Sequence, residues 1–252
     1  MLDFLKSPIA ALQDFYILTG RALLNIFRGP HYADDIAMQM DIIGVGSLPI
    51  VALVSFFSGV VITMQMSRAL SQYGAVGQVG QIVALTLVRE LGPVLTAVVV
   101  AGRVASGIAS ELGSMKVTEQ IDAMRALGTD PIQKLVTPRM IASAVMLPLL
   151  VICADFVGIV GGYLIAYFTL GLTTSQYWTN AYQSLEYNDV VQGLLKPFVF
   201  AFIISLVGCF YGLRTSGGTQ GVGLATTKAV VAASVWIFVL TTFLTRIFVN
   251  LH

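Results

Sequence analysis

The sequence has few charged side chains and a correspondingly large apolar fraction. Only 11% of its 252 residues are Asp, Glu, Lys or Arg, whereas hydrophobic residues make up 56%. Soluble domains carry roughly 25% charged residues, so this composition argues against an ordinary soluble domain. The formal net charge is +1, so no strong overall field indicates a nucleic-acid partner. We therefore expect an integral membrane protein.

Cysteine and histidine are also scarce, and their positions do not indicate chemistry. Cys153 and Cys209 lie inside apolar runs, far from the spacing of metal ligands, so we expect them to pack as apolar side chains. His31 and His252 are isolated. The sequence thus predicts no metal site and no catalytic residues.

A nucleotide-binding motif is missing as well. The chain contains no GxxxxGK[ST] stretch and no Gly-Lys pair, which a P-loop needs to hold nucleotide phosphates. We expect no cofactor in this chain, and any use of ATP would require a separate subunit.

Five apolar runs are long enough to cross a bilayer, which takes about 20 residues. The second run is interrupted by Arg89, Glu90 and Arg103, and the third contains Asp155, which has no evident partner in the sequence. The predicted fold is an all-α polytopic membrane protein with five transmembrane helices. They cover residues 42–67, about 81–110, 140–168, 193–213 and 229–250.

The basic residues predict the orientation of these spans. Lys and Arg are frequent in the N-terminal arm and in residues 103–139 and 214–228, but absent from residues 140–195. Loops rich in Lys and Arg stay in the cytoplasm. We therefore expect a cytoplasmic N-terminus and a periplasmic C-terminus.

The first 30 residues have the pattern of an amphipathic helix. Ser7, Asp14, Arg21 and Arg28 recur every seven residues and form one narrow polar stripe, while apolar side chains cover the rest. Gly29-Pro30 would end the helix. We expect residues 1–30 to lie in the membrane interface rather than to act as a signal peptide, and residues 31–252 to form the transmembrane domain.

Small residues recur every fourth position in the second expected span. One stripe contains Ala101, Ala105, Ala109 and Gly113, and Gly102, Ser106, Ser110 and Ser114 form the adjacent one. Small side chains let helices approach closely in lipid. These stripes predict helix packing rather than chemistry.

The sequence Arg89-Glu90-Leu91-Gly92-Pro93 places two charges beside a proline inside that span. Pro93 has no N–H to offer the carbonyl of Arg89, so the helix should bend there. Each charge at bilayer depth costs on the order of 2.5–3.5 kcal/mol. We expect Arg89 and Lys196 to contact an anionic lipid head group, with Glu90 orienting Arg89. The alternative is a structural ion pair with a neighbouring helix.

Residues 117–128 have the pattern of a short amphipathic helix outside the spans. Val117, Ile121 and Met124 share one face, Glu119, Asp122 and Arg125 share another, and Gly128 is a natural end. The alternatives are an ordinary interfacial helix and a knob that fits a groove on a soluble partner.

These features resemble the MlaE-type permeases of ABC transporters that move lipids between bacterial membranes. The resemblance covers about residues 42–250. It rests on Arg89-Glu90-Leu91-Gly92-Pro93, Ala101-Gly102-Arg103, Glu111-Leu112-Gly113, Thr118-Glu119-Gln120 and Thr129-Asp130-Pro131.

The resemblance implies a homodimeric phospholipid permease in the bacterial inner membrane, with an amphipathic elbow helix before the first span. It implies three partners: a cytoplasmic ATPase that uses ATP and Mg²⁺, a periplasmic MCE-domain ring and, in some systems, a small STAS-domain protein. Arg89, Glu90 and Lys196 match positions that line an outward-facing lipid cavity. Some relatives carry a carboxylate in the last span, where Thr241 and Thr242 are the nearest polar residues here. The residues expected to contact the ATPase are Glu119, Gln120, Ile121, Asp122, Met124 and Arg125.

Two other classes of protein remain open from the residues alone. A membrane enzyme acting on lipids would need a His, Asp or Ser cluster at an interface, and both histidines lie outside the spans. A secondary transporter would usually show internal repeats with broken helices in both halves. The sequence shows no such repeat, and it does not identify the lipid or the direction of transport.

Overall fold

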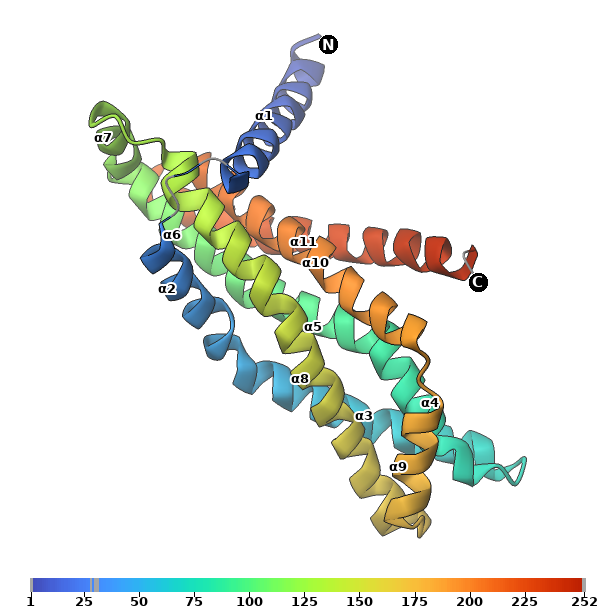
Figure 1. The fold of residues 1–252 in the computed structure, drawn as a ribbon. Helices are drawn as coiled ribbons and strands as arrows, with labels where there is room; N and C mark the ends of the chain where they lie inside the picture. Colours follow the sequence, from blue (N-terminus) through green and yellow to red (C-terminus); the bar gives the residue numbers. More distant parts are fainter. Residues whose placement is uncertain (1, 28, 30–31, 251–252) are drawn as a thin grey trace. The chain divides into compact units, whose positions relative to one another are not determined.

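The computed structural model describes residues 2–27, 29 and 32–250, and helices account for nearly all of them (Figure 1). No strand occurs in these described ranges, which confirms the all-α class. The α-helices are α1 (Leu2–Phe27), α2 (Ala33–Ile43), α3 (Leu48–Ser71), α4 (Val79–Thr86), α5 (Gly92–Val100), α6 (Ser106–Val117), α7 (Gln120–Ala126), α8 (Thr137–Leu170), α9 (Thr174–Gln183), α10 (Tyr187–Leu213) and α11 (Gly218–Asn250).

Short segments of other helix types join several of these elements. Two are 3₁₀ turns, η1 (Val45–Ser47) and η2 (Val76–Gln78). Three are π-helical: η3 (Leu87–Leu91), η4 (Ala101–Ala105) and η5 (Ile132–Val136). A π turn inserts one extra residue into a helix and often marks a functional site. No sequence pattern predicted these π segments.

Within the described residues, five helical stretches are long and apolar enough to cross a membrane, which confirms the predicted number. Most begin or end several residues beyond the predicted limits, because helix continues past the first charged or polar side chain. Asp34 and Asp35, for example, lie in the first turn of α2, where the helix dipole favours negative charge. The stretches are Ala33–Ser71, Val76–Val117, Ile132–Leu170, Tyr187–Leu213 and Gly218–Phe248.

The chain divides into two compact units, and each is described separately. Unit 1 contains residues 1–43, 101–144 and 201–236. Unit 2 contains residues 44–100, 145–200 and 237–252.

In unit 2, the short helix α9 packs against α4. Tyr177 of α9 is fully buried, and its hydroxyl donates a hydrogen bond to the carbonyl of Ile159. The Asn180 side chain donates to the carbonyl of Gly77 at 2.7 Å. The two helices can approach closely because residue 80 is glycine. A Cβ there would lie only 2.7 Å from the carbonyl oxygen of Tyr177. This contact closes one end of the unit's apolar core.

Glycines also bring α3 and α8 into backbone contact within unit 2. A Cβ on Gly59 would lie 1.8 Å from the carbonyl oxygen of Gly158, and one on Gly161 would lie 2.4 Å from that of Phe56. Neither position has room for a side chain. In lipid, such close packing replaces the hydrophobic effect as the force that holds helices together.

In unit 1, the small-residue stripe of the second span packs against α10. Ala101, Ala105 and Ala109 are fully buried. A Cβ on Gly208 of α10 would lie 3.1 Å from the carbonyl oxygen of Ala105, and one on Gly212 would lie 3.2 Å from that of Ala109, so glycine allows a close approach to this stripe. The predicted packing role is thus confirmed for this stripe. The adjacent stripe is exposed at Gly102, Ser110 and Ser114 in the single chain.

Cations near the ends of spans in unit 1 are paired with carboxylates. Arg139 is buried and forms an ion pair with Glu111 at 2.7 Å. Lys134 pairs with Asp35 and lies over the ring of Tyr32. Pairing offsets the cost of removing each charge from water. These pairs explain how the helical stretches extend beyond the predicted apolar limits.

The predicted N-terminal helix corresponds to α1. Its described side chains are mostly exposed, with Leu18 and Ala22 buried. Asp14 of the predicted polar stripe is exposed. Arg28 and Pro30 lie outside the described residues, as does the side chain of Ser7.

We predict that Gly59→Ala lowers the melting temperature of the purified protein in detergent. The new methyl group would collide with the Gly158 backbone, and overpacking of this kind typically costs about 1–3 kcal/mol. Gly107→Ala is the matched control, since Gly107 is exposed in α6 with no atom within 4 Å of an added Cβ. An unchanged melting temperature for Gly59→Ala would contradict the close α3–α8 contact.

Candidate functional site

The π segment η3 carries Arg89 and Glu90 at the start of the proline-containing turn. The N–H of Gly92 donates to the carbonyl of Leu87, five residues back, so the helix is wider here than an α-helix. Pro93 has no N–H, so the carbonyl of Arg89 needs another donor. That donor is the Nζ atom of Lys196, at 2.8 Å.

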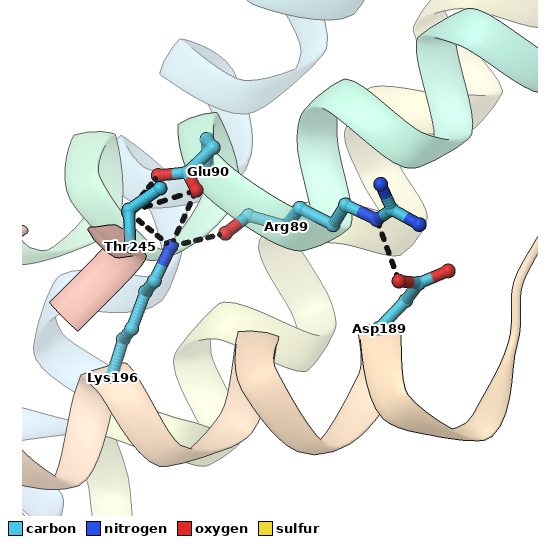
Figure 2. Close-up of polar contacts among 5 residues, drawn as sticks. All are labelled: Arg89, Glu90, Asp189, Lys196 and Thr245. Carbon is cyan, nitrogen blue, oxygen red and sulfur yellow. Dashed lines mark hydrogen bonds and ion pairs between the residues drawn. The ribbon is translucent and has the colours of Figure 1, made fainter. Parts of the chain in front are cut away.

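Lys196 is fully buried, and three acceptors surround its ammonium group (Figure 2). Nζ donates to the Arg89 carbonyl, to Oε1 of Glu90 at 2.7 Å and to Oγ1 of Thr245 at 3.1 Å. A lysine ammonium has three N–H donors, so these bonds use all of them. The Thr245 hydroxyl in turn donates to the Glu90 carboxylate. Lys196, Glu90, Thr245 and the Arg89 carbonyl form a closed group, here called the Lys196 cluster.

The Arg89 side chain points away from this cluster toward Asp189 (Figure 2). Its Nε atom donates to Oδ1 of Asp189 at 2.6 Å. Asp189 is buried and also accepts the backbone N–H of Glu186 through Oδ2, which holds the carboxylate at the start of α10. The Arg89 side chain remains 44% exposed. Its terminal nitrogens are therefore positioned by the Nε bond and are accessible from outside.

These groups border a pocket of about 420 Å³ in unit 2. The wall carries a cation and three acids, with a threonine, a glutamine and one aromatic ring. The lining residues are Arg89, Glu90, Glu186, Asp189, Gln192, Thr245 and Phe248. An arginine fork bordered by polar and aromatic groups suits a phosphate attached to an apolar body, because guanidinium binds phosphate oxygens in a bidentate manner.

The structure brings the three predicted lipid-site residues together, but their surroundings differ. Only Arg89 has a half-exposed cation, whereas all N–H donors of Lys196 are used inside the protein. Glu90 contacts Lys196 and Thr245 rather than the guanidinium of Arg89. The orienting carboxylate of Arg89 is Asp189, so both charges of the Arg-Glu pair have partners on other helices.

Five lining residues were not predicted as part of the site: Glu186, Asp189, Gln192, Thr245 and Phe248. Asp189 and Gln192 lie seven and four residues before the predicted Lys196 on α10, which puts all three on one helix face, and this spacing could have identified the first two. Thr245 of α11 carried no comparable signal. It is the polar contact from the last span, in place of the nearby Thr241 and Thr242.

Asp155 of α8 lies against the same turn, at Gly92. A Cβ at Gly92 would come within 1.7 Å of its Oδ1 atom, so position 92 accommodates only glycine. This contact gives a steric reason for the glycine that precedes Pro93.

The second candidate region is α7, which is shorter than the expected helix over residues 117–128. α6 ends at Val117, and Glu119 takes a left-handed conformation with φ 60° before α7 begins. The helix ends as predicted at Gly128, whose φ is 79°. The N–H groups of Gly128 and Thr129 donate back into the last turn of α7, the Schellman arrangement that closes a helix.

The side chains of α7 divide into a buried anchor and an exposed surface. Ile121 is fully buried and Met124 is half-buried. Asp122 forms ion pairs with Lys116 at 2.7 Å and with Arg125 at 3.0 Å. The hydrogen bond from Lys116 is the main reason that the pKa of Asp122 is lowered from its usual value. The exposed charged and polar residues here are Glu119, Gln120, Asp122 and Arg125.

Comparison with known proteins identifies the family of this chain. The family profile described as Permease MlaE matches residues 36–247 of this chain, which include η3, α7 and Thr245.

Several relatives align over most of their length. A probable ABC transporter permease of Rickettsia typhi is 44% identical over 225 residues, which is 89% of this chain and 87% of the relative. A probable ABC transporter permease of Synechocystis is 42% identical and covers 91% and 87%, respectively. The intermembrane phospholipid transport system permease protein MlaE of Haemophilus influenzae is 32% identical over 98% of both chains. With its five candidate spans, the chain is a multi-pass membrane protein that belongs to the MlaE permease family.

Proposed function

We propose that this chain is the permease subunit of an ABC transporter that moves phospholipid between the inner and outer membranes of a bacterium. Family membership and the phospholipid transport name of the Haemophilus influenzae relative support this function. The observation that carries it is the half-exposed Arg89 guanidinium, which Asp189 holds at the edge of a pocket of about 420 Å³.

In this proposal, Arg89 binds the phosphate of the lipid directly. Its Nε is fixed by Asp189, so the terminal nitrogens are oriented before the lipid arrives. Lys196 and Glu90 would not contact the lipid and would stabilise the turn that carries Arg89. A direct contact between Lys196 and the head group would require the ammonium to give up internal acceptors.

The exposed surface of α7 is proposed to dock on a cytoplasmic ATPase, which would bind and hydrolyse ATP with Mg²⁺. Glu119, Gln120 and Arg125 are exposed there, and half-buried Met124 adds an apolar contact. Ile121 would contribute as the buried anchor of the helix rather than through direct contact. Asp122 would hold the charged surface together through Lys116 and Arg125.

The remaining partners follow from the family. We propose a homodimer, because α11 leaves many large apolar side chains exposed in the single chain, among them Val235, Phe238 and Phe243. A periplasmic MCE-domain ring and, in some systems, a STAS-domain protein would complete the assembly. The distribution of Lys and Arg supports insertion in the inner membrane with a cytoplasmic N-terminus and a periplasmic C-terminus.

We predict that removing the Arg89 guanidinium lowers the phospholipid occupancy of the intact complex. The variant Arg89→Gln with Asp189→Asn removes both charges and leaves no buried unpaired carboxylate. The bound lipid, counted by native mass spectrometry, should fall severalfold, while acyl-chain contacts retain a remainder.

Two controls separate lipid binding from folding. Asp189→Asn alone keeps the guanidinium and should retain more lipid than the double variant. Lys196→Met should mainly lower the melting temperature, because it removes the buried ammonium that donates to the Glu90 carboxylate and to the carbonyl of Arg89. Normal lipid occupancy in a folded Arg89→Gln/Asp189→Asn complex would rule out the phosphate contact.

We predict that Glu119→Lys weakens copurification of the ATPase about tenfold while the permease still inserts in the membrane. A charge reversal at an interface leaves contacts unpaired or repulsive. Asp34→Lys is the matched control, since it makes the same charge change at another exposed position. Equal recovery of the ATPase with both variants would remove α7 from the interface.

The proposed orientation predicts the labelling of two single-cysteine proteins. With Cys153 and Cys209 replaced by alanine, Gln183→Cys should react with an impermeant maleimide added from the periplasmic side, and Thr219→Cys should not. Both positions are exposed in the chain, so a difference in reactivity reports sidedness. Labelling of both from one side would contradict the five-span arrangement.

A further inference from the structure

Unit 1 contains two adjoining hollows that the proposed transport function does not use. The first, here called the basic pocket, has a volume of about 350 Å³ and includes Arg214 and Lys228 in its lining. The second, the apolar groove, has a volume of about 370 Å³ and includes Leu12, Phe15 and Trp236. The two share Ala11, Phe210 and Tyr211 as a common wall. They therefore form one continuous depression with a polar end and an apolar end.

Side chains of α1 and α10 hold the walls of this depression together. Asp14 of α1 forms an ion pair with Arg214 at 2.8 Å. One residue along, the rings of Phe15 and Phe210 meet edge to face with centroids 5.3 Å apart. The guanidinium of Arg214 also lies over the Phe210 ring at 5.2 Å. The depression is thus bordered by α1, α10 and the first half of α11.

The polar end has a net positive charge. Arg214 and Lys228 contribute two cations, and Asp14 offsets one of them. Arg214 keeps 44% of its side chain exposed, and Lys228 is exposed with no carboxylate partner among the described residues. The opposite end is bordered by Phe15, Val207 and Trp236. A ligand that matches both ends carries an anionic head on an apolar tail.

We propose that this depression binds an anionic phospholipid of the surrounding bilayer. The phosphate lies between Arg214 and Lys228 in the basic pocket, and an acyl chain follows the apolar groove beside Trp236. Basic pockets between membrane helices are suited to anionic head groups in this way. The lipid bridges α1 to α10 and α11, so it acts as a resident part of the fold. The proposal is independent of the Arg89 pocket and of lipid transport.

Trp236 provides a direct probe, because the chain has only two tryptophans. Trp178→Phe leaves Trp236 as the single tryptophan of the full-length protein. This protein is reconstituted in vesicles of phosphatidylcholine with a minor share of phosphatidylglycerol, and bromine is placed on the acyl chains of one lipid or the other. At equal mole fraction, brominated phosphatidylglycerol should quench Trp236 more strongly, with a local preference on the order of fivefold for one net charge.

Charge variants assign this preference to the basic pocket. Arg214→Gln with Lys228→Gln should reduce the preference to about one, whereas the charge-preserving variant Arg214→Lys with Lys228→Arg should keep most of it. Arg68→Gln with Arg246→Gln is the matched control, since it removes two exposed cations elsewhere and should leave the preference unchanged. Circular dichroism checks that each protein is folded.

Three results would overturn the proposal. Equal quenching by the two brominated lipids would mean that the site does not select anionic lipid. A preference that survives Arg214→Gln with Lys228→Gln would place the selectivity elsewhere. Quenching by neither lipid would mean that protein, such as a second copy of the chain, covers the groove.

Discussion

The candidate site depends on one hydrogen bond, from the Lys196 ammonium to the carbonyl of Arg89. Pro93 leaves that carbonyl without its helical donor, and an unsatisfied carbonyl in an apolar setting costs several kcal/mol. The donor carries a charge, so it needs Glu90, whose carboxylate is held in turn by Thr245. The requirements of one proline thereby tie three helical stretches of unit 2 together. The turn fixed in this way positions Arg89, whose side chain is bonded to Asp189 through Nε only.

The sequence predicted the number of spans, the packing of the Ala101–Gly113 stripe and the end of α7 at Gly128. The length of an apolar run, four-residue spacing and a glycine at a helix end each depend on residues that are close in the sequence. Such features can be predicted without knowing which helices are neighbours. The π segments were not predictable in the same way. An extra residue in a helix leaves no periodic trace over five positions, and the contacts around η3 come from residues distant in the sequence, such as Lys196 and Asp155.

The candidate site shows the same division. The charges of Arg89, Glu90 and Lys196 stood out because charge is costly in an apolar span. Their pairing could not be predicted, since a sequence does not reveal which helices are neighbours. A structural ion pair and a contact with a lipid head group were the two interpretations of Arg89 and Glu90, and the structure does not make them mutually exclusive. Both side chains have structural partners, yet the exposed part of Arg89 remains free for a ligand in the described structure.

The connection between α6 and α7 has a mechanical consequence. It is short, its turn is fixed by the left-handed Glu119, and the ion pair between Lys116 and Asp122 crosses it on one side. Ile121 of α7 is fully buried and anchors the helix on its neighbours. A joint with these three constraints is stiff, so a push on α7 displaces the end of α6 instead of bending the link. α7 and the end of the second span, α6, are therefore expected to move together.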